Sequence, residues 1–128
     1  MREITTHKLN GLNDAITITT RDEPGSGGAH HLYRLEYDNE KWGPDKNSMR
    51  QTHEIAFQKG PIKEAFVNGI SNEALLAIVI DRIQCFQSGE YKCRENAIAL
   101  THLEDAMHWL QHRTRQRLTR GVEGTLQK

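Results

Sequence analysis

The fold is decided by the stretch 69–121, which reads GISNEALLAIVIDRIQCFQSGEYKCRENAIALTHLEDAMHWLQHRTRQRLTRG. It contains two helix patterns joined by a short turn. Ser71 is a good N-cap and Gly89 a good C-cap for the first helix, while the second runs from near Cys93 to Gly121. At about 1.5 Å per residue, the second helix is about 40 Å long against about 27 Å for the first. The pattern therefore predicts a helical hairpin whose second helix extends past the first by about two turns.

Each predicted helix carries apolar side chains on one face, at the spacing of an amphipathic helix. On the first helix these are Leu75, Leu76, Val79, Ile80, Ile83 and Phe86. On the second they are Ala99, Leu103, Ala106 and Leu110, with Leu100 and Met107 beside them. We expect this second stripe to continue to Asn96 at one end, and to Arg113 and Arg117 at the other.

The overhanging end of the second helix is strongly basic. It carries Arg113, Arg115, Arg117 and Arg120, although the whole chain has 17 basic and 17 acidic residues. Guanidinium groups bind phosphate through charge-assisted, bidentate hydrogen bonds. We therefore expect another copy of the chain, an anionic ligand, or both to cover this end. The alternative is a solvated helix end whose cations complement the negative helix dipole.

The first half of the chain has the alternation of β structure. Apolar and polar residues alternate over 16–19 and 33–37, with a breaker-rich loop at 22–29 between them, and further strands are expected within 3–9 and 53–59. The sequence thus predicts one α+β domain, a small N-terminal antiparallel β-sheet followed by a two-helix antiparallel hairpin. Its expected regions are 1–60 for the sheet, 61–70 for a connector, 71–121 for the hairpin and 122–128 for a loose tail.

The composition argues against several classes of function. The balanced charge is atypical of a non-specific nucleic-acid or membrane-surface binder. There is no long apolar run and no N-terminal signal pattern, so we expect a soluble intracellular protein with Cys85 and Cys93 as free thiols rather than a disulfide. Only 36% of the residues are hydrophobic, which predicts a modest core and favours oligomerisation.

The turn between the two helices combines aromatic and cationic residues. Phe86, Tyr91 and Arg94 lie around it, and aromatic and arginine side chains suit stacking on a nucleobase. The alternative is that Phe86 belongs to the core and Tyr91 is a turn residue with a solvated hydroxyl. The glycine-rich run 25–28 could likewise present backbone N–H groups to an anion, or be a simple hairpin loop.

The sequence gives no positive argument for catalysis or for a metal. His108 and His112 lie one helical turn apart and could share a metal ion, but no cysteine or carboxylate completes a recognised zinc spacing. Nucleophile–base signatures are absent. We therefore expect a protein that is not an enzyme and that holds neither metal nor cofactor.

Four segments resemble small phage proteins with the Acb2/Tad1-type helical hairpin domain, namely 60–76, 93–106, 113–115 and 120–125. The β region, with its loop at 22–29 followed by His31 and Tyr33, is similar to the Tad1-like branch. This resemblance implies an anti-defence protein in the cytoplasm of the infected host, one that sequesters glycocyclic ADP-ribose of Thoeris without cleaving it. It also implies a homohexamer, with separate pockets for cyclic di- or trinucleotides.

The resemblance further implies a set of ligand-binding residues. Phe86, Asn96 and Arg113 correspond by position, and Tyr91, Arg94 and Arg117 are added because they lie near those three. Asn96 and Arg113 are separated by 17 residues, or about 25 Å of helix, so one chain cannot close both onto one small ligand. Helix geometry therefore predicts a site between subunits.

Two other functions remain open at the level of sequence. The first is a nucleic-acid-binding phage regulator that uses the basic helix tip, whose binding would weaken steeply with salt. The second is an enzyme that degrades the same signal.

Overall fold

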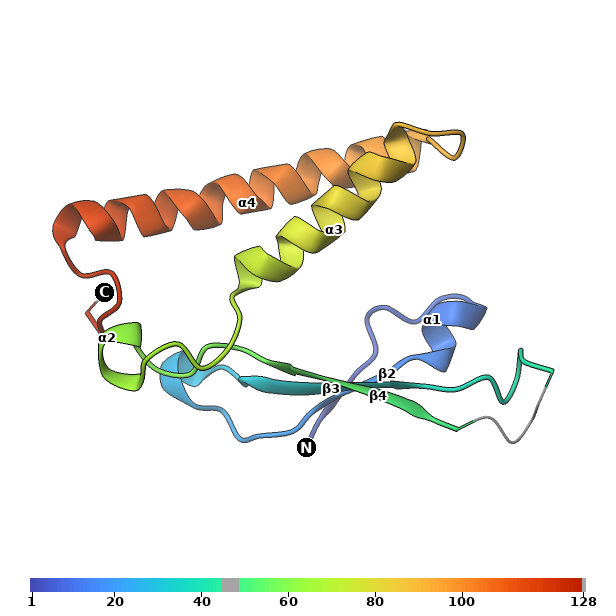
Figure 1. Cartoon of the computed structure of the whole chain (residues 1–128), viewed down its shortest axis with the longest axis horizontal. Coiled ribbons are helices and arrows are strands. Elements are labelled where there is room, and N and C mark those ends of the chain that lie inside the picture. The colour runs from blue at the N-terminus through green and yellow to red at the C-terminus, as the bar shows by residue number, and fades with distance from the viewer. Residues whose placement is uncertain (45–48, 128) are drawn as a thin grey trace. The chain divides into compact units, whose positions relative to one another are not determined.

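The computed structural model describes residues 1–44 and 49–127. The chain divides into two compact units, residues 1–59 and 60–128 (Figure 1). The first unit contains the antiparallel sheet and the second contains the helical hairpin, which confirms the α+β prediction. The division falls one residue before the expected end of the sheet region, and the expected connector belongs to the helical unit.

The first unit is a four-stranded antiparallel sheet in the order β1-β2-β3-β4. The expected strands near 3–9, 16–19, 33–37 and 53–59 are all present with shifted ends. A short helix, α1 (Gly11–Ala15), separates the first two strands. The strands are β1 (Glu3–Ile4), β2 (Thr17–Thr20), β3 (Leu32–Tyr37) and β4 (Gln51–Ala56).

The register of the sheet gives it one apolar and one charged face. Leu35 pairs with Ile18 on one side and His53 on the other, and side chains two residues apart on a strand share a face. Tyr33 lies on the same face and meets the ring of Phe57 edge-on, with 5.6 Å between the ring centroids. The opposite face carries charged pairs, including the guanidinium of Arg34 at 2.7 Å from the carboxylate of Glu54.

The second unit contains α2 (Ile62–Ala65), α3 (Asn72–Gln87) and α4 (Arg94–Arg120). The Ser71 side chain accepts a hydrogen bond from the Ala74 backbone at 3.1 Å, which confirms the predicted N-cap of α3. The Cys93 thiol caps α4 by accepting from the backbone of Asn96 at 3.4 Å. With 27 residues in α4 and 16 in α3, the predicted overhang is confirmed.

The half-buried face of α4 differs in part from the predicted stripe. Ala106 is exposed, and the stripe ends through Thr114 rather than Arg113. From Leu110, a step of three reaches Arg113 and a step of four reaches Thr114, so helical spacing permits either residue, and the structure has Thr114 on the half-buried face. The half-buried or buried residues of α4 are Asn96, Ala99, Leu100, Leu103, Met107, Leu110, His112, Thr114 and Arg117.

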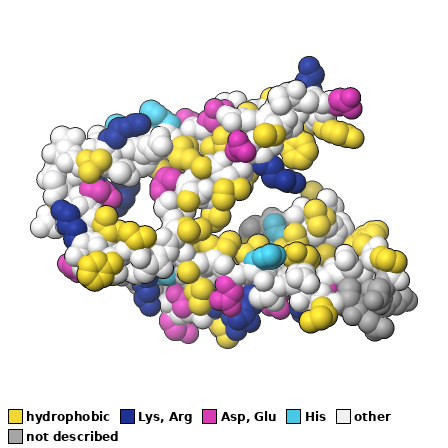
Figure 2. Space-filling view, in the orientation of Figure 1, with side chains coloured by type: hydrophobic (Ala, Val, Ile, Leu, Met, Phe, Trp, Pro, Cys, Tyr) yellow, Lys and Arg dark blue, Asp and Glu magenta, His cyan; other side chains and the backbone are white. Residues whose placement is uncertain are grey.

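On α3, only part of the predicted apolar face is half-buried. Leu75, Leu76, Ile80 and Ile83 are half-buried, but Val79 and Phe86 are exposed, contrary to their predicted place in the packed face. Among the described residues, no hydrophobic side chain is fully buried. In Figure 2, hydrophobic groups lie interspersed with polar and charged groups on the visible surface of the helical hairpin. A single chain therefore buries little hydrophobic surface in its described part.

Candidate functional site

The overhanging end of α4 presents a basic surface. Arg113, Arg115 and Arg120 are all exposed. An open hollow of about 540 Å³ follows one face of the helix and is lined by His112, Arg115, Gln116, Thr119 and Arg120. Exposed guanidinium groups beside an imidazole can bind phosphate oxygens without first breaking an internal ion pair. This end of the hairpin therefore has the chemistry of an anion site.

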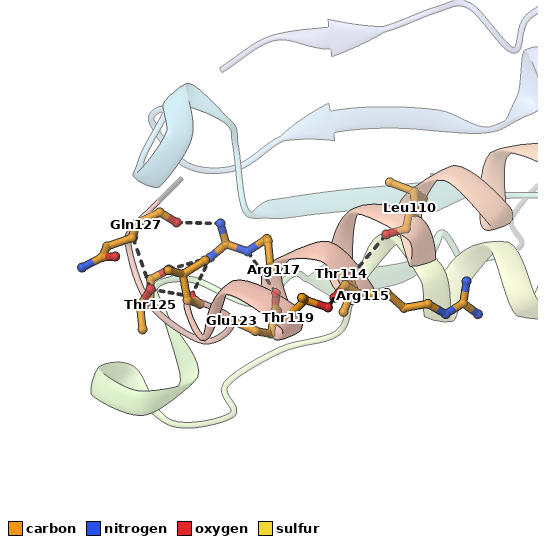
Figure 3. Close-up of polar contacts among 9 residues, drawn as sticks. Leu110, Thr114, Arg115, Arg117, Thr119, Glu123, Thr125 and Gln127 are labelled. Carbon is orange, nitrogen blue, oxygen red and sulfur yellow. Dashed lines mark hydrogen bonds and ion pairs between the residues drawn. The ribbon is translucent and has the colours of Figure 1, made fainter.

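Arg117 is different from the other three arginines, and its expected role as a ligand contact is not supported. Only 6% of it is exposed. Its guanidinium donates to the Glu123 carboxylate at 3.0 Å and to the backbone carbonyl oxygens of Gln127 at 2.6 Å, Val122 at 2.9 Å and Thr125 at 3.1 Å (Figure 3). These four hydrogen bonds direct the group to the C-terminal tail.

The C-terminal segment is consequently not the loose tail that the sequence predicted. Gly121 has a φ of 73°, in the left-handed region that favours glycine, and ends α4. Its N–H donates to the Leu118 carbonyl, and the Val122 N–H donates to the Arg117 carbonyl, both at 3.1 Å. This pair of bonds is a Schellman motif. The sequence identifies the glycine but not the contacts that hold the residues after it.

The other end of the hairpin combines an aromatic ring with cations. Phe86 is 41% exposed, so it is not the core residue of the alternative interpretation. The Arg82 guanidinium lies over its ring, 5.3 Å from the centroid, a separation typical of a cation–π contact. Tyr91 and Arg94 are also exposed at this end. The two faces of an exposed ring can stack on a cation and on a flat ligand at once.

Asn96 lies near the aromatic end, at the start of the half-buried face of α4. The six predicted ligand residues therefore fall into two groups at opposite ends of the helix. Asn96 and Arg113 belong to one continuous helix, which places their backbones about 25 Å apart. Within one chain, the structure does not bring the two groups together.

A protein-family model described as Acb2/Tad1, hairpin domain, matches residues 49–115, slightly more than half of the chain. The chain belongs to this family. It is also 54% identical over 74 residues to a protein named Thoeris anti-defense 1 from Bacillus phage SBSphiJ7. The alignment covers 58% of this chain and 52% of the phage protein, so the chain spans about half the length of that relative. These matches confirm the Tad1-type resemblance.

The α4 helix of this chain also carries an aromatic cluster that was not predicted from the sequence. The rings of His108 and His112 are stacked, with centroids 6.2 Å apart and an interplanar angle of 21°. Trp109 meets both edge-on, at 5.4 Å and 5.5 Å, and is 60% exposed. From the sequence, the two histidines were considered only as possible ligands of a shared metal ion. Their spacing with Trp109 on one helix was the signal for this cluster.

In the sheet unit, the loop that precedes β3 is closed by a carboxylate. Both oxygens of Asp22 accept backbone N–H groups, from His31 at 3.0 Å and from Leu32 at 3.2 Å. These bonds, with the nearby His30 ring, hold the pKa of Asp22 below its ordinary value even though burial opposes the shift. Gly27 and Gly28 have φ of 73° and 81°. The loop thus has a fixed base and a tip that only glycine adopts readily.

Both cysteines are free and exposed, as predicted. Cys93 is used as a helix cap, and Gln87 bridges back to it by accepting from its N–H and donating to its carbonyl, each at 3.0 Å. These bonds close the turn without a disulfide.

No helix within residues 1–44 and 49–127 is long and apolar enough to cross a membrane.

Proposed function

We propose that the protein is a phage anti-defence protein that sequesters a cyclic nucleotide immune signal and does not cleave it. The observation that carries the proposal is the family hairpin, with an exposed aromatic end and an exposed arginine end. The 54% identity to Thoeris anti-defense 1 over 74 residues supports it. The proposed ligand is glycocyclic ADP-ribose, and cyclic di- or trinucleotides are further candidates. The proposed setting is the cytoplasm of the infected host.

The residues present fit the chemistry of that ligand. A cyclic ADP-ribose has a pyrophosphate, an adenine and ribose hydroxyls. Arg113 is free to donate to phosphate, and Phe86 offers an exposed ring face for adenine. The Asn96 side-chain amide can bond a ribose hydroxyl. Tyr91 and Arg94 are secondary candidates at the aromatic end, whereas the bonds of Arg117 to the tail argue against its use.

The two ends of the hairpin must come from different chains to surround one small ligand. About 25 Å of helix separates Asn96 from Arg113, further than a compact dinucleotide reaches. A second observation supports association. Ile78 and Val79 are exposed on α3, and no hydrophobic side chain in the described part of the chain is fully buried. We propose a homo-oligomer, a hexamer as the family resemblance implies, with ligand sites between subunits.

Sequestration requires tight binding, and no covalent bond of the ligand is broken. The site proposed here contains arginine, aromatic and amide groups, which stabilise a bound phosphate and base. We therefore propose a non-enzymatic binder. Each occupied site removes one molecule of the signal from solution, so more protein leaves less free signal.

Native mass spectrometry with and without glycocyclic ADP-ribose tests this proposal. The expected result is an oligomer that gains whole ligand masses. Addition of fragment masses would point to the degrading enzyme instead, and no mass gain with any cyclic nucleotide would refute the proposal. A protein without ligand that remains a monomer would refute the intersubunit site.

One observation favours a second function, nucleic-acid binding. The hollow lined by His112, Arg115 and Arg120 is basic and open, so a phosphate backbone could lie along it. Binding of that kind loses affinity steeply with salt, by about one power of salt concentration for each phosphate contacted. A shallow salt dependence for the cyclic nucleotide and negligible affinity for duplex DNA would exclude this alternative.

A further inference from the structure

The buried Arg117 connects three segments of the helical unit. Its guanidinium holds the tail through one carboxylate and three backbone carbonyls. The tail in turn contacts α2, because the Lys63 N–H donates to the Gly124 carbonyl at 3.4 Å. A Cβ added at Gly124 would lie only 3.1 Å from a side-chain carbon of Ile62, and the φ of this glycine is 81°. The end of α4, the tail and the start of α2 therefore meet at one point.

The geometry of these contacts requires an arginine. The planar guanidinium presents its N–H donors in a fixed fork, and here that fork reaches four oxygens spread over residues 122–127. A lysine has the same charge but one nitrogen with three donors, so it cannot reach the same four oxygens. The three tail carbonyls lie within reach of one guanidinium only when residues 122–127 are folded back toward the end of α4.

We propose that Arg117 is a positioning residue that locks the tail onto α2 and α4 and thereby holds Arg113 in its ligand-binding position. Arg113 lies one turn before Arg117 on α4, and Arg113 itself is exposed. Fixing the helix end at Arg117 restricts the motion of the preceding turn. A ligand-binding group that is already ordered loses less conformational entropy on binding. The role of Arg113 rests on the proposed function, whereas the lock itself does not.

The test uses Arg117→Lys in the full chain, with Arg115→Lys as the matched control. Arg115 is an exposed arginine two residues away, and its side chain points away from the tail in Figure 3. Hydrogen exchange is measured first, without ligand. The expected result is faster exchange in Arg117→Lys at residues 122–127 and at the Lys63 amide, with the control unchanged. Equal exchange in wild type and Arg117→Lys would overturn the lock.

A double-mutant cycle with glycocyclic ADP-ribose then tests whether Arg117 acts through Arg113. We expect Arg117→Lys to weaken binding about tenfold in the wild-type background and to have no further effect once Arg113→Ala is present. A general loss of structure would weaken both backgrounds equally, so additive effects would overturn the positioning role. If the wild-type protein does not bind the ligand at all, the proposed function fails, and the exchange data alone support or overturn the lock.

Discussion

Arg113 and Arg117 lie one turn apart on α4, yet the structure places them in opposite environments. Arg117 is 6% exposed and bound to the tail, while Arg113 is exposed. Two residues of the same type, both predicted to contact a ligand, thus differ because only Arg117 binds the segment that follows it by five to ten residues. The exposed one has the properties of a binding group, and the buried one those of a support.

The first prediction concerns Arg113. Arg113→Ala should weaken binding of glycocyclic ADP-ribose about 10- to 100-fold, because a hydrogen bond to a charged group contributes about 1.5–3 kcal/mol. Calorimetric titration measures the change. Arg50→Ala is the control, and it should shift Kd by less than about threefold, because Arg50 lies in the sheet unit and pairs there with Glu36 at 3.6 Å. An unchanged Kd for Arg113→Ala would remove this residue from the site.

A site shared between subunits makes a prediction about mixed oligomers. Neither Asn96→Ala nor Arg113→Ala should bind ligand tightly alone. When the two variants are mixed, unfolded and refolded together, random pairing should restore about one intact site in four. A site built within one chain would recover none. Native mass spectrometry on both variants and on the mixture counts the bound ligands and checks that each sample still assembles.

Phe86 is expected to stack on the adenine. Phe86→Leu keeps an apolar side chain but loses the flat ring, and it should weaken binding by about 1–3 kcal/mol, the range for one stacked base. Phe86→Tyr keeps the ring and should retain most of the affinity. Equal affinities of wild type and Phe86→Leu, measured by the same titration, would show that the ring does not contact the ligand.

Exposed apolar groups on α3 are expected to be covered in the oligomer. Val79 is 43% exposed, and Val79→Glu would place a charge in the proposed interface, where an unpaired charge is costly. We expect a smaller assembly in sedimentation velocity, with helix content unchanged by circular dichroism. Gln84→Glu adds the same charge to α3 at another exposed position and serves as the control. An assembly of unchanged size would place the interface elsewhere.

The sequence predicts structural features well when they depend on residues close together along the chain, and poorly when they depend on the folded arrangement. The caps at Ser71 and Gly121 are local, and the sequence identifies them because cap chemistry involves residues within one turn. The strands were also found, since alternation is visible along the chain. The burial of Arg117 was not found, because it depends on carbonyl groups whose placement requires the folded tail. Val79 and Phe86 fit the amphipathic pattern, but only the structure shows that both side chains stay exposed.

Asp22 gives the sheet unit a pH-dependent contribution to stability. Hydrogen bonds to the ionised carboxylate lower its folded-state pKa, so its stabilising effect is complete above the ordinary value of 3.8 and is lost as the pH falls through the folded-state value. Asp22→Asn should therefore unfold at lower urea concentration than wild type at pH 7, with a difference that shrinks as the pH is lowered toward 3. Glu23→Gln, at the exposed neighbour, should show no such difference. Identical wild-type and Asp22→Asn midpoints at pH 7 would contradict this account.

Recovery of the nucleotide from a purified complex shows whether the protein holds its ligand intact. Protein is incubated with glycocyclic ADP-ribose, freed of unbound ligand by gel filtration and denatured, and the released nucleotide is quantified by chromatography. We expect intact glycocyclic ADP-ribose in a fixed ratio to the subunits. Release of linear or cleaved products, or of no nucleotide, would contradict it.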